Sequence, residues 1–144
     1  MQRLILIILL FTAVIFSRGQ GYPIRQVPFT AVEVTDDFWR PRIKTNHEVT
    51  IPIAFGYCET TGRIKNFEVA GGLTEGTFCT KYPFDDSDVF KIVEGASYSL
   101  QTFPDPELEA YLDTLIYKFA MAQEDDGYLT TWKTIDPDEP PATW

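Results

Sequence analysis

Two stretches of the chain carry apolar residues at the spacing of an amphipathic helix. In the first, which reaches Leu100, the apolar side chains recur every three or four positions, at Val89, Ile92, Val93, Ala96 and Leu100. A second stripe runs to about Gln123 and consists of Leu108, Leu112, Leu115, Ile116 and Phe119. The short linker "TFPDPEL" between them predicts an antiparallel hairpin, in which Asp105 caps the second helix and Pro106 occupies its first turn.

An earlier helix is predicted over residues 41–61, with a kink at Pro52 and an end just before Gly62. Residues 65–84 contain paired glycines and show no sustained period, so we expect a long loop there. Paired helices with long loops on one side fit a helical toroid or solenoid. A three-helix bundle fits the same apolar stripes, because both architectures pack such stripes together.

The two ends of the chain have less regular patterns. Residues 21–35 mix prolines with alternating apolar residues and predict an extended arm, with room for one short edge strand. After the hairpin, "EDDGYLTTW" predicts a turn at Asp126 and Gly127 and then a short extended piece. The final residues, "KTIDPDEPPATW", are acidic and rich in proline like a connector, and from this we expect the chain to be part of a longer protein.

The first twenty residues have the pattern of a secretory signal peptide. A basic residue, Arg3, precedes an apolar run from Leu4 to Phe16, and the small residues Ser17 and Gly19 follow. The run has 13 residues, whereas a membrane-spanning helix needs about 20. We therefore expect residues 1–20 to be removed, leaving a secreted or periplasmic protein without a membrane anchor.

Charge narrows the class of partner. The formal net charge is -9, and loss of Arg3 and Arg18 with the signal peptide changes it to -11. Nucleic acids and anionic membranes are poor partners for such a chain, because their phosphates must be neutralised by Lys and Arg. A neutral partner such as a carbohydrate fits better.

Few residues could hold a metal ion. The only cysteines are Cys58 and Cys79, and the only histidine is His47. These residues cannot form a structural zinc site alone, because such a site takes four ligands. A disulfide between the two cysteines is possible in an oxidising compartment, and the sequence does not require it.

Acidic residues gather where the helix ending at Leu100 begins, in "FDDSDVF". One interpretation is that Asp86 or Ser87 is simply the N-cap of this helix. The other is a polar pocket, for which Asp88 is the first candidate to contact a ligand. Lys91 and Glu94, one helical turn apart, predict an exposed pair.

Four segments together carry a resemblance to a known family: "DDFWRPRIKTNHEVTIPIAF", "GRIKNFEVAGG", "FDDSDVFKIVEGASYSLQTFPDPELEAYLD" and "MAQEDDGYLTTW". In this order and spacing they resemble the N-terminal part of the catalytic domain of glycoside hydrolase family 127, also known as DUF1680. Characterised members include β-L-arabinofuranosidases. The resemblance implies an all-α fold, the N-terminal part of an (α/α)6 barrel. Residues 21–38 would then be an N-terminal arm and residues 39–144 an incomplete catalytic domain.

The family's chemistry, as this resemblance implies it, is retaining hydrolysis by a zinc-bound cysteine thiolate, with further cysteines and a glutamate as metal ligands. All of these residues lie downstream of the segments present here. Cys58 and Cys79 do not match them, so the resemblance assigns this chain no catalytic residue and no metal ligand. Zinc is expected in the full-length enzyme and no cofactor in this chain. We therefore expect no catalysis from it alone.

In such a barrel, the start of the helix at Asp86 and the turn after the next helix would share a rim where the sugar binds. The resemblance therefore makes Asp86, Asp88, Asp126 and Tyr128 candidates for substrate binding, because carboxylates accept hydrogen bonds from sugar hydroxyls and a tyrosine offers a flat apolar face. The implied partner is an L-arabinofuranosyl glycan. The alternative is a non-catalytic helical module that binds carbohydrate or a protein partner through this acidic rim.

Overall fold

The computed structural model describes residues 24–138, which form two units, residues 24–32 and residues 33–138. The first unit is exposed throughout and contains one 3-10 turn, η1 (Phe29–Ala31). The predicted signal peptide lies outside the described residues. None of the residues from 24 to 138 lies in a β-strand, so the edge strand allowed by the sequence pattern is absent from this part of the arm.

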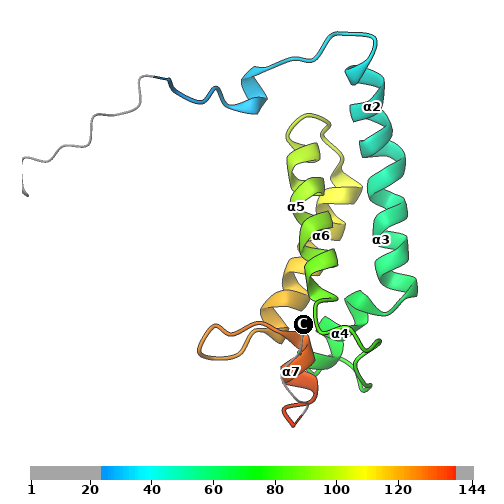
Figure 1. The fold of residues 1–144 in the computed structure, drawn as a ribbon, viewed down its shortest axis with the longest axis vertical. Coiled ribbons are helices and arrows are strands. Elements are labelled where there is room, and N and C mark those ends of the chain that lie inside the picture. The colour runs from blue at the N-terminus through cyan, green and yellow to red at the C-terminus, as the bar shows by residue number, and fades with distance from the viewer. Residues whose placement is uncertain (1–23, 139–144) are drawn as a thin grey trace, which may run out of the picture. The chain divides into compact units, whose positions relative to one another are not determined.

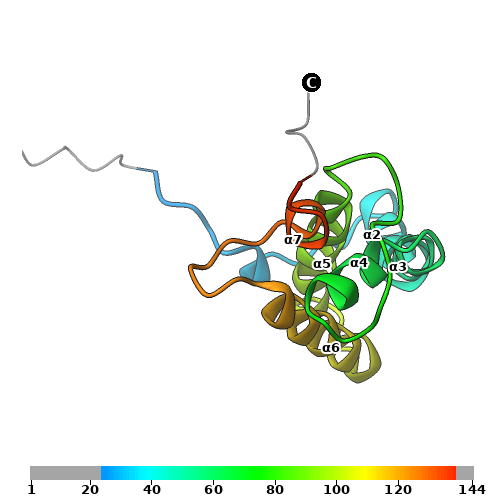
Figure 2. The same ribbon diagram turned by 90° about the horizontal axis from the view of Figure 1, so that it is seen from below.

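The larger unit is built entirely from helices (Figures 1 and 2). A first long helical segment leads to a hairpin of two long helices, and two shorter helices lie at one end of that hairpin. In chain order the elements are α2 (Trp39–Thr45), η2 (Asn46–Thr50), α3 (Ile51–Thr60), α4 (Arg63–Ala70), α5 (Asp86–Leu100), α6 (Pro106–Ala122) and α7 (Thr131–Ile135).

Elements α2, η2 and α3 form one continuous helical segment with a π-helical turn inside it. This turn, η2, ends two residues before Pro52. Proline lacks the N–H group of a regular helix, and its ring collides with the carbonyl one turn earlier. A locally widened turn relieves that collision. The helix predicted over residues 41–61 is therefore present, and its irregularity lies just ahead of Pro52.

The expected loop over residues 65–84 is wrong in its first part, because residues 63–70 form helix α4. Gly62 makes the sharp turn between α3 and α4 with a φ of +81°, a conformation in which glycine has no steric penalty. Ile64 and Phe67 are buried on the face of α4 that meets the hairpin. A helix of eight residues is too short to be stable by itself, so this packing holds it.

Helices α5 and α6 form the predicted antiparallel hairpin (Figure 1). As predicted, Asp105 caps α6: its Oδ1 accepts hydrogen bonds from the backbone N–H groups of Glu107 and Leu108, at 3.0 and 3.1 Å. The core between the hairpin and α4 centres on Phe67, whose ring lies 4.6 Å from that of Phe119 and 5.5 Å from that of Phe90. Buried core positions from α3, α5 and α6 extend this cluster.

The segment after α6 begins with the predicted turn. Gly127 has a φ of +90°, and its N–H group donates to the carbonyl of Glu124. The expected extended piece is wrong beyond Thr130, since residues 131–135 form the short helix α7. The reason is a tertiary contact, described below, that supplies an acceptor for the first N–H group of this helix.

Candidate functional site

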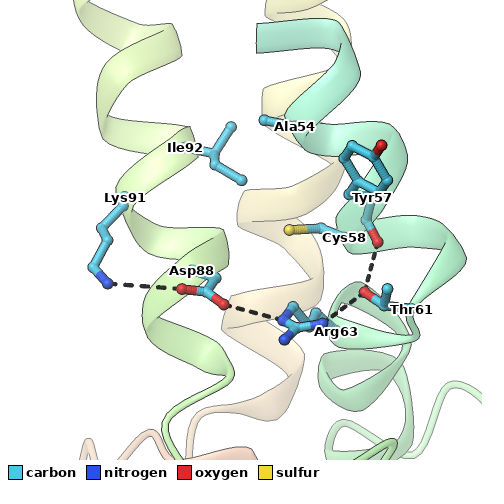
Figure 3. A pocket seen from close by; sticks show the side chains of 8 residues that line it. All are labelled: Ala54, Tyr57, Cys58, Thr61, Arg63, Asp88, Lys91 and Ile92. Carbon is cyan, nitrogen blue, oxygen red and sulfur yellow. Dashed lines mark hydrogen bonds and ion pairs between the residues drawn. The ribbon is translucent and has the colours of Figure 1, made fainter. Parts of the chain in front are cut away.

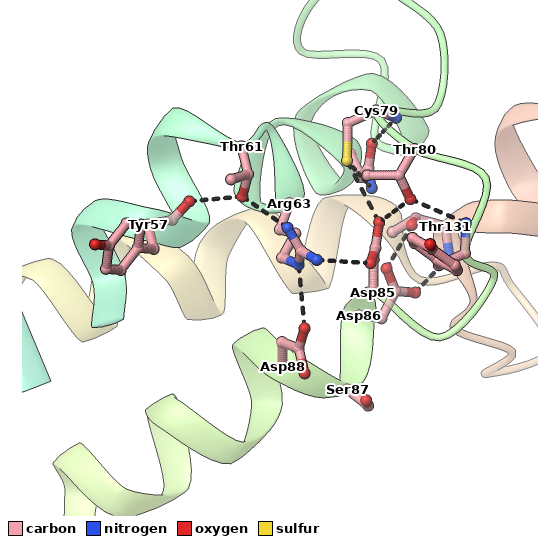
Figure 4. Close-up of polar contacts among 12 residues, drawn as sticks. Tyr57, Thr61, Arg63, Cys79, Thr80, Asp85, Asp86, Ser87, Asp88 and Thr131 are labelled. Atoms are coloured by element: carbon pink, nitrogen blue, oxygen red, sulfur yellow. Dashed lines mark hydrogen bonds and ion pairs between the residues drawn. The ribbon is translucent and has the colours of Figure 1, made fainter. Parts of the chain in front are cut away.

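The acidic residues at the start of α5 meet a basic side chain from α4 (Figure 4). Asp85, which directly precedes α5, is 0% exposed. Its Oδ2 accepts hydrogen bonds from Thr80 at 2.5 Å and from the Cys79 thiol at 3.5 Å. Its Oδ1 makes no hydrogen bond and is balanced by the guanidinium of Arg63, whose Nη2 lies 3.2 Å away.

Arg63 joins the buried acid to a more exposed one. Its Nε donates to Asp88 Oδ2 at 3.1 Å, and its Nη1 donates to Thr61 Oγ1 at 2.8 Å. Burial opposes the charge on Arg63, but the two aspartates outweigh that effect and raise the pKa of the guanidinium. Arg63 is therefore held in one position by partners on three sides.

Asp86 contacts a different part of the chain from its neighbours. It is 6% exposed, and its two oxygens accept hydrogen bonds from the backbone N–H and the hydroxyl of Thr131, at 2.8 and 2.5 Å. The expectation that Asp86 or Ser87 caps α5 is wrong, since the N-cap position is Asp85 and no side chain caps the helix there. Asp86 instead fixes the first turn of α7 beside α5.

Burial raises the pKa of Asp86 above its ordinary 3.8; the hydrogen bonds from Thr131 oppose this shift, and the charge of Asp85 adds to it. The folded protein therefore keeps the Asp86 proton to a higher pH than the unfolded chain does. This makes the free energy of unfolding fall as the pH rises from 3.8 through the raised pKa.

We expect the free energy of unfolding of Asp86→Asn to depend less on pH in this range, because an amide does not titrate. At neutral pH the loss of one acceptor for Thr131 should cost about 1–3 kcal/mol, and removal of the buried charge should offset part of that cost. Urea unfolding at a series of pH values from about 4 upward measures both effects. Asp126→Asn, at an exposed position, is the matched control. An unchanged pH dependence in Asp86→Asn would contradict this account.

The other two predicted contact residues lie on the turn after α6. Asp126 is exposed, and its Oδ1 accepts a hydrogen bond from the backbone N–H of Tyr128, as expected of a turn residue. Tyr128 is also exposed. A role of Asp86, Asp88, Asp126 and Tyr128 in sugar binding stays a prediction. Asp88 lines a cavity.

That cavity, of about 440 Å³, lies between α3 and α5 (Figure 3). Asp88 is part of its lining, with Lys91 Nζ 3.7 Å from Oδ1 and Arg63 Nε 3.1 Å from Oδ2. The lining is formed by Ala54, Tyr57, Cys58, Thr61, Arg63, Asp88, Lys91 and Ile92. Lys91 thus pairs with Asp88, and the expected pairing with Glu94 is not among its ion contacts.

Three residues of the site, Arg63, Tyr57 and Thr131, were not predicted from the sequence. Arg63 carried a usable signal, because it directly follows the helix-ending Gly62 and is one of only 12 basic residues. Thr131 carried none, because its partner Asp86 is 45 residues away in the chain. His47 is a packing residue, stacked on Phe103 and in contact with the Ser99 hydroxyl at 3.0 Å.

The described residues do not fit the zinc ion that the family resemblance implies. Within residues 24–138, no three His, Cys, Asp or Glu side chains are placed to hold a metal ion. Both cysteines are free thiols: Cys58 is buried on α3, and Cys79 receives a hydrogen bond from the Asn66 amide. Burial raises the pKa of each thiol, which disfavours the thiolate that zinc binds.

The comparison with protein families decides where the chain belongs. The model of the GH127 catalytic domain, described as β-L-arabinofuranosidase, matches residues 31–144. The chain belongs to this family. Its all-helical fold is accordingly the N-terminal part of the (α/α)6 barrel of GH127 enzymes. None of the helices described within residues 24–138 is long and apolar enough to cross a membrane.

Individual GH127 relatives agree with this assignment. The non-reducing end β-L-arabinofuranosidase of Bifidobacterium longum subsp. longum is 34% identical over 119 residues, which are 69% of this chain and 18% of the relative. A solved GH127 β-arabinofuranosidase is 51% identical with a TM-score of 0.76, covering 84% of this chain and 19% of that one.

A second solved enzyme, Ara127N-Se from Geobacillus stearothermophilus T6, is a GH127 β-L-arabinofuranosidase. It is 35% identical with a TM-score of 0.71, and the match covers 74% of this chain and 18% of that one. The chain thus spans about a fifth of the length of these GH127 proteins.

Proposed function

We propose that this chain is the N-terminal part of a secreted or periplasmic retaining glycoside hydrolase that releases L-arabinofuranosyl units from glycans. The match of the GH127 catalytic domain to residues 31–144 is the observation that carries the proposal. The pattern of residues 1–20 supports export. Relatives named as β-L-arabinofuranosidases support the choice of sugar.

The side chains of this chain are suited to bind and orient a substrate, and they are not suited to cleave it. A retaining glycosidase needs a nucleophile and an acid on either side of the scissile bond. The two thiols of the chain have raised pKa values, and Cys58 is buried, so neither is an activated nucleophile. We infer that the chain has no hydrolytic activity by itself and that the catalytic groups belong to the remainder of the enzyme.

Hydrolysis of p-nitrophenyl β-L-arabinofuranoside tests both parts of this proposal. We expect no measurable release of p-nitrophenol by the purified 144-residue chain. A protein that continues through the reading frame beyond Trp144 should hydrolyse the substrate, because it would supply the nucleophile and the acid. p-Nitrophenyl α-L-arabinofuranoside serves as the matched control substrate. Hydrolysis by the short chain would refute the inference that the catalytic groups lie in the remainder of the enzyme. An inactive extended protein would refute the proposed hydrolase activity.

A further inference from the structure

The cavity between α3 and α5 combines groups that suit a sugar. Tyr57 contributes an aromatic ring, Asp88 a carboxylate and Lys91 an ammonium group, while Cys58 and Ile92 make part of the lining apolar (Figure 3). Sugars present hydroxyls that donate and accept hydrogen bonds, and an apolar C–H face that packs on aromatic rings. The volume of about 440 Å³ is in the range of small-molecule sites.

The polar groups of the cavity are held in place before any ligand binds. Arg63 fixes one oxygen of Asp88 and is itself fixed by the buried Asp85 and by Thr61. The other oxygen of Asp88 lies 3.7 Å from Lys91 Nζ. A carboxylate accepts about four hydrogen bonds and an ammonium donates three, so both groups keep capacity for a ligand. Such preorganisation lowers the entropy cost of binding.

The charges around the cavity favour a neutral ligand. The positive charge of Arg63 is balanced by Asp85 and Asp88, and that of Lys91 by Asp88. No uncompensated cation therefore faces the cavity to attract a phosphate or a carboxylate. Tyr57, which is 68% exposed, presents a ring that a neutral sugar can cover.

The same groups cannot cleave a glycosidic bond. Asp88 is the only carboxylate in the lining, whereas hydrolysis uses an acid and a nucleophile on opposite sides of the bond. We propose that this cavity binds a neutral furanose unit of the glycan other than the unit that the enzyme releases. The inference rests on the proposed function, which supplies the L-arabinofuranosyl class of ligand.

Substrates of different length test the cavity against the catalytic centre. In the protein extended beyond Trp144, Tyr57→Ala should raise KM about tenfold for an L-arabinofuranosyl disaccharide, through loss of one stacked ring. KM for the single-sugar p-nitrophenyl glycoside, and kcat for both substrates, should stay within about twofold. Tyr117→Ala, at another exposed tyrosine, on α6, is the matched control and should change KM for neither substrate.

The outcomes separate the two proposals. Unchanged KM values in Tyr57→Ala, or an equal rise for both substrates, would refute sugar binding in the cavity. The proposed hydrolase activity would not be affected by that result. Failure of the unaltered extended protein to hydrolyse either substrate would overturn the hydrolase. In that case a binding measurement tests whether the cavity holds a sugar. Ligand-observed NMR should detect the disaccharide bound to the unaltered chain and to Tyr117→Ala, and not to Tyr57→Ala. An undetected disaccharide on the unaltered chain overturns the cavity.

A chimera makes the kinetic comparison independent of the solubility of this chain. In it, residues 33–138 replace the matching segment of the solved GH127 β-arabinofuranosidase that is 51% identical. Tyr57→Ala in the chimera should again raise KM for the disaccharide alone. A chimera that hydrolyses both substrates equally well with and without Tyr57 would overturn the proposed site.

Discussion

Arg63→Met is expected to lower the free energy of unfolding by about 3–5 kcal/mol, the range measured when one partner of a buried ion pair is removed. Asp85 is 0% exposed, and the Arg63 guanidinium is the group that balances its Oδ1. Without that guanidinium, the carboxylate must stay charged in a medium that solvates it poorly, or take up a proton. Urea unfolding of the variant beside the unaltered chain measures the loss.

Two further variants show whether the buried charge is the cause. The double variant Arg63→Met with Asp85→Asn removes both charges and should recover most of the stability, because an amide still accepts from Thr80. Lys44→Met breaks an ion pair with Glu48 in which both side chains are exposed, and it should cost less than about 1 kcal/mol. A loss in Arg63→Met as small as in Lys44→Met would show that Asp85 is compensated in another way.

Phe67→Ala is expected to destabilise the chain by about 3–5 kcal/mol, as found when a large aromatic is removed from a packed core. Phe67 is 0% exposed and contacts the rings of both Phe90 and Phe119, so its loss leaves a cavity where α4 packs on the hairpin. The midpoint of urea unfolding, followed by circular dichroism at helical wavelengths, measures the effect.

The control for this core variant is Tyr117→Ala on α6. Tyr117 is exposed, and its removal should change the free energy of unfolding by no more than about 0.5 kcal/mol. Phe67→Leu, which keeps most of the volume, should lie between the two. Equal stabilities of the Phe67→Ala and Tyr117→Ala variants would mean that α4 does not depend on this cluster.

The helices that the sequence predicted well are those whose signals are local. The stripes of α5 and α6, and the Asp105–Pro106 start of α6, repeat along consecutive turns and need no distant partner. Helix α4 was missed because its eight residues include only a short apolar face, and its stability comes from contact of Phe67 with the hairpin. Such tertiary stabilisation leaves little periodicity to detect.

For the site too, local signals were visible in the sequence and tertiary contacts were not. The sequence pointed to the acids at the start of α5, since clustered carboxylates are visible in a linear chain. It named Asp88, which lines the cavity, as the first candidate for ligand contact, but it could not separate the surroundings of Asp88 from those of Asp86, which is buried and bonded to Thr131. That distinction depends on residues from α4 and α7 that reach α5 only in the folded chain.

The hydrogen bonds between Asp86 and Thr131 also constrain the order of events during folding. The two residues are 45 positions apart in the chain, so the hairpin of α5 and α6 can form while the Asp86 carboxylate still faces water. Contacts within the hairpin close shorter loops than this one does and form sooner. Among the helices of residues 33–138 we therefore expect α7 to dock last, and the acidic start of α5 should keep the hairpin charged and hydrated until then.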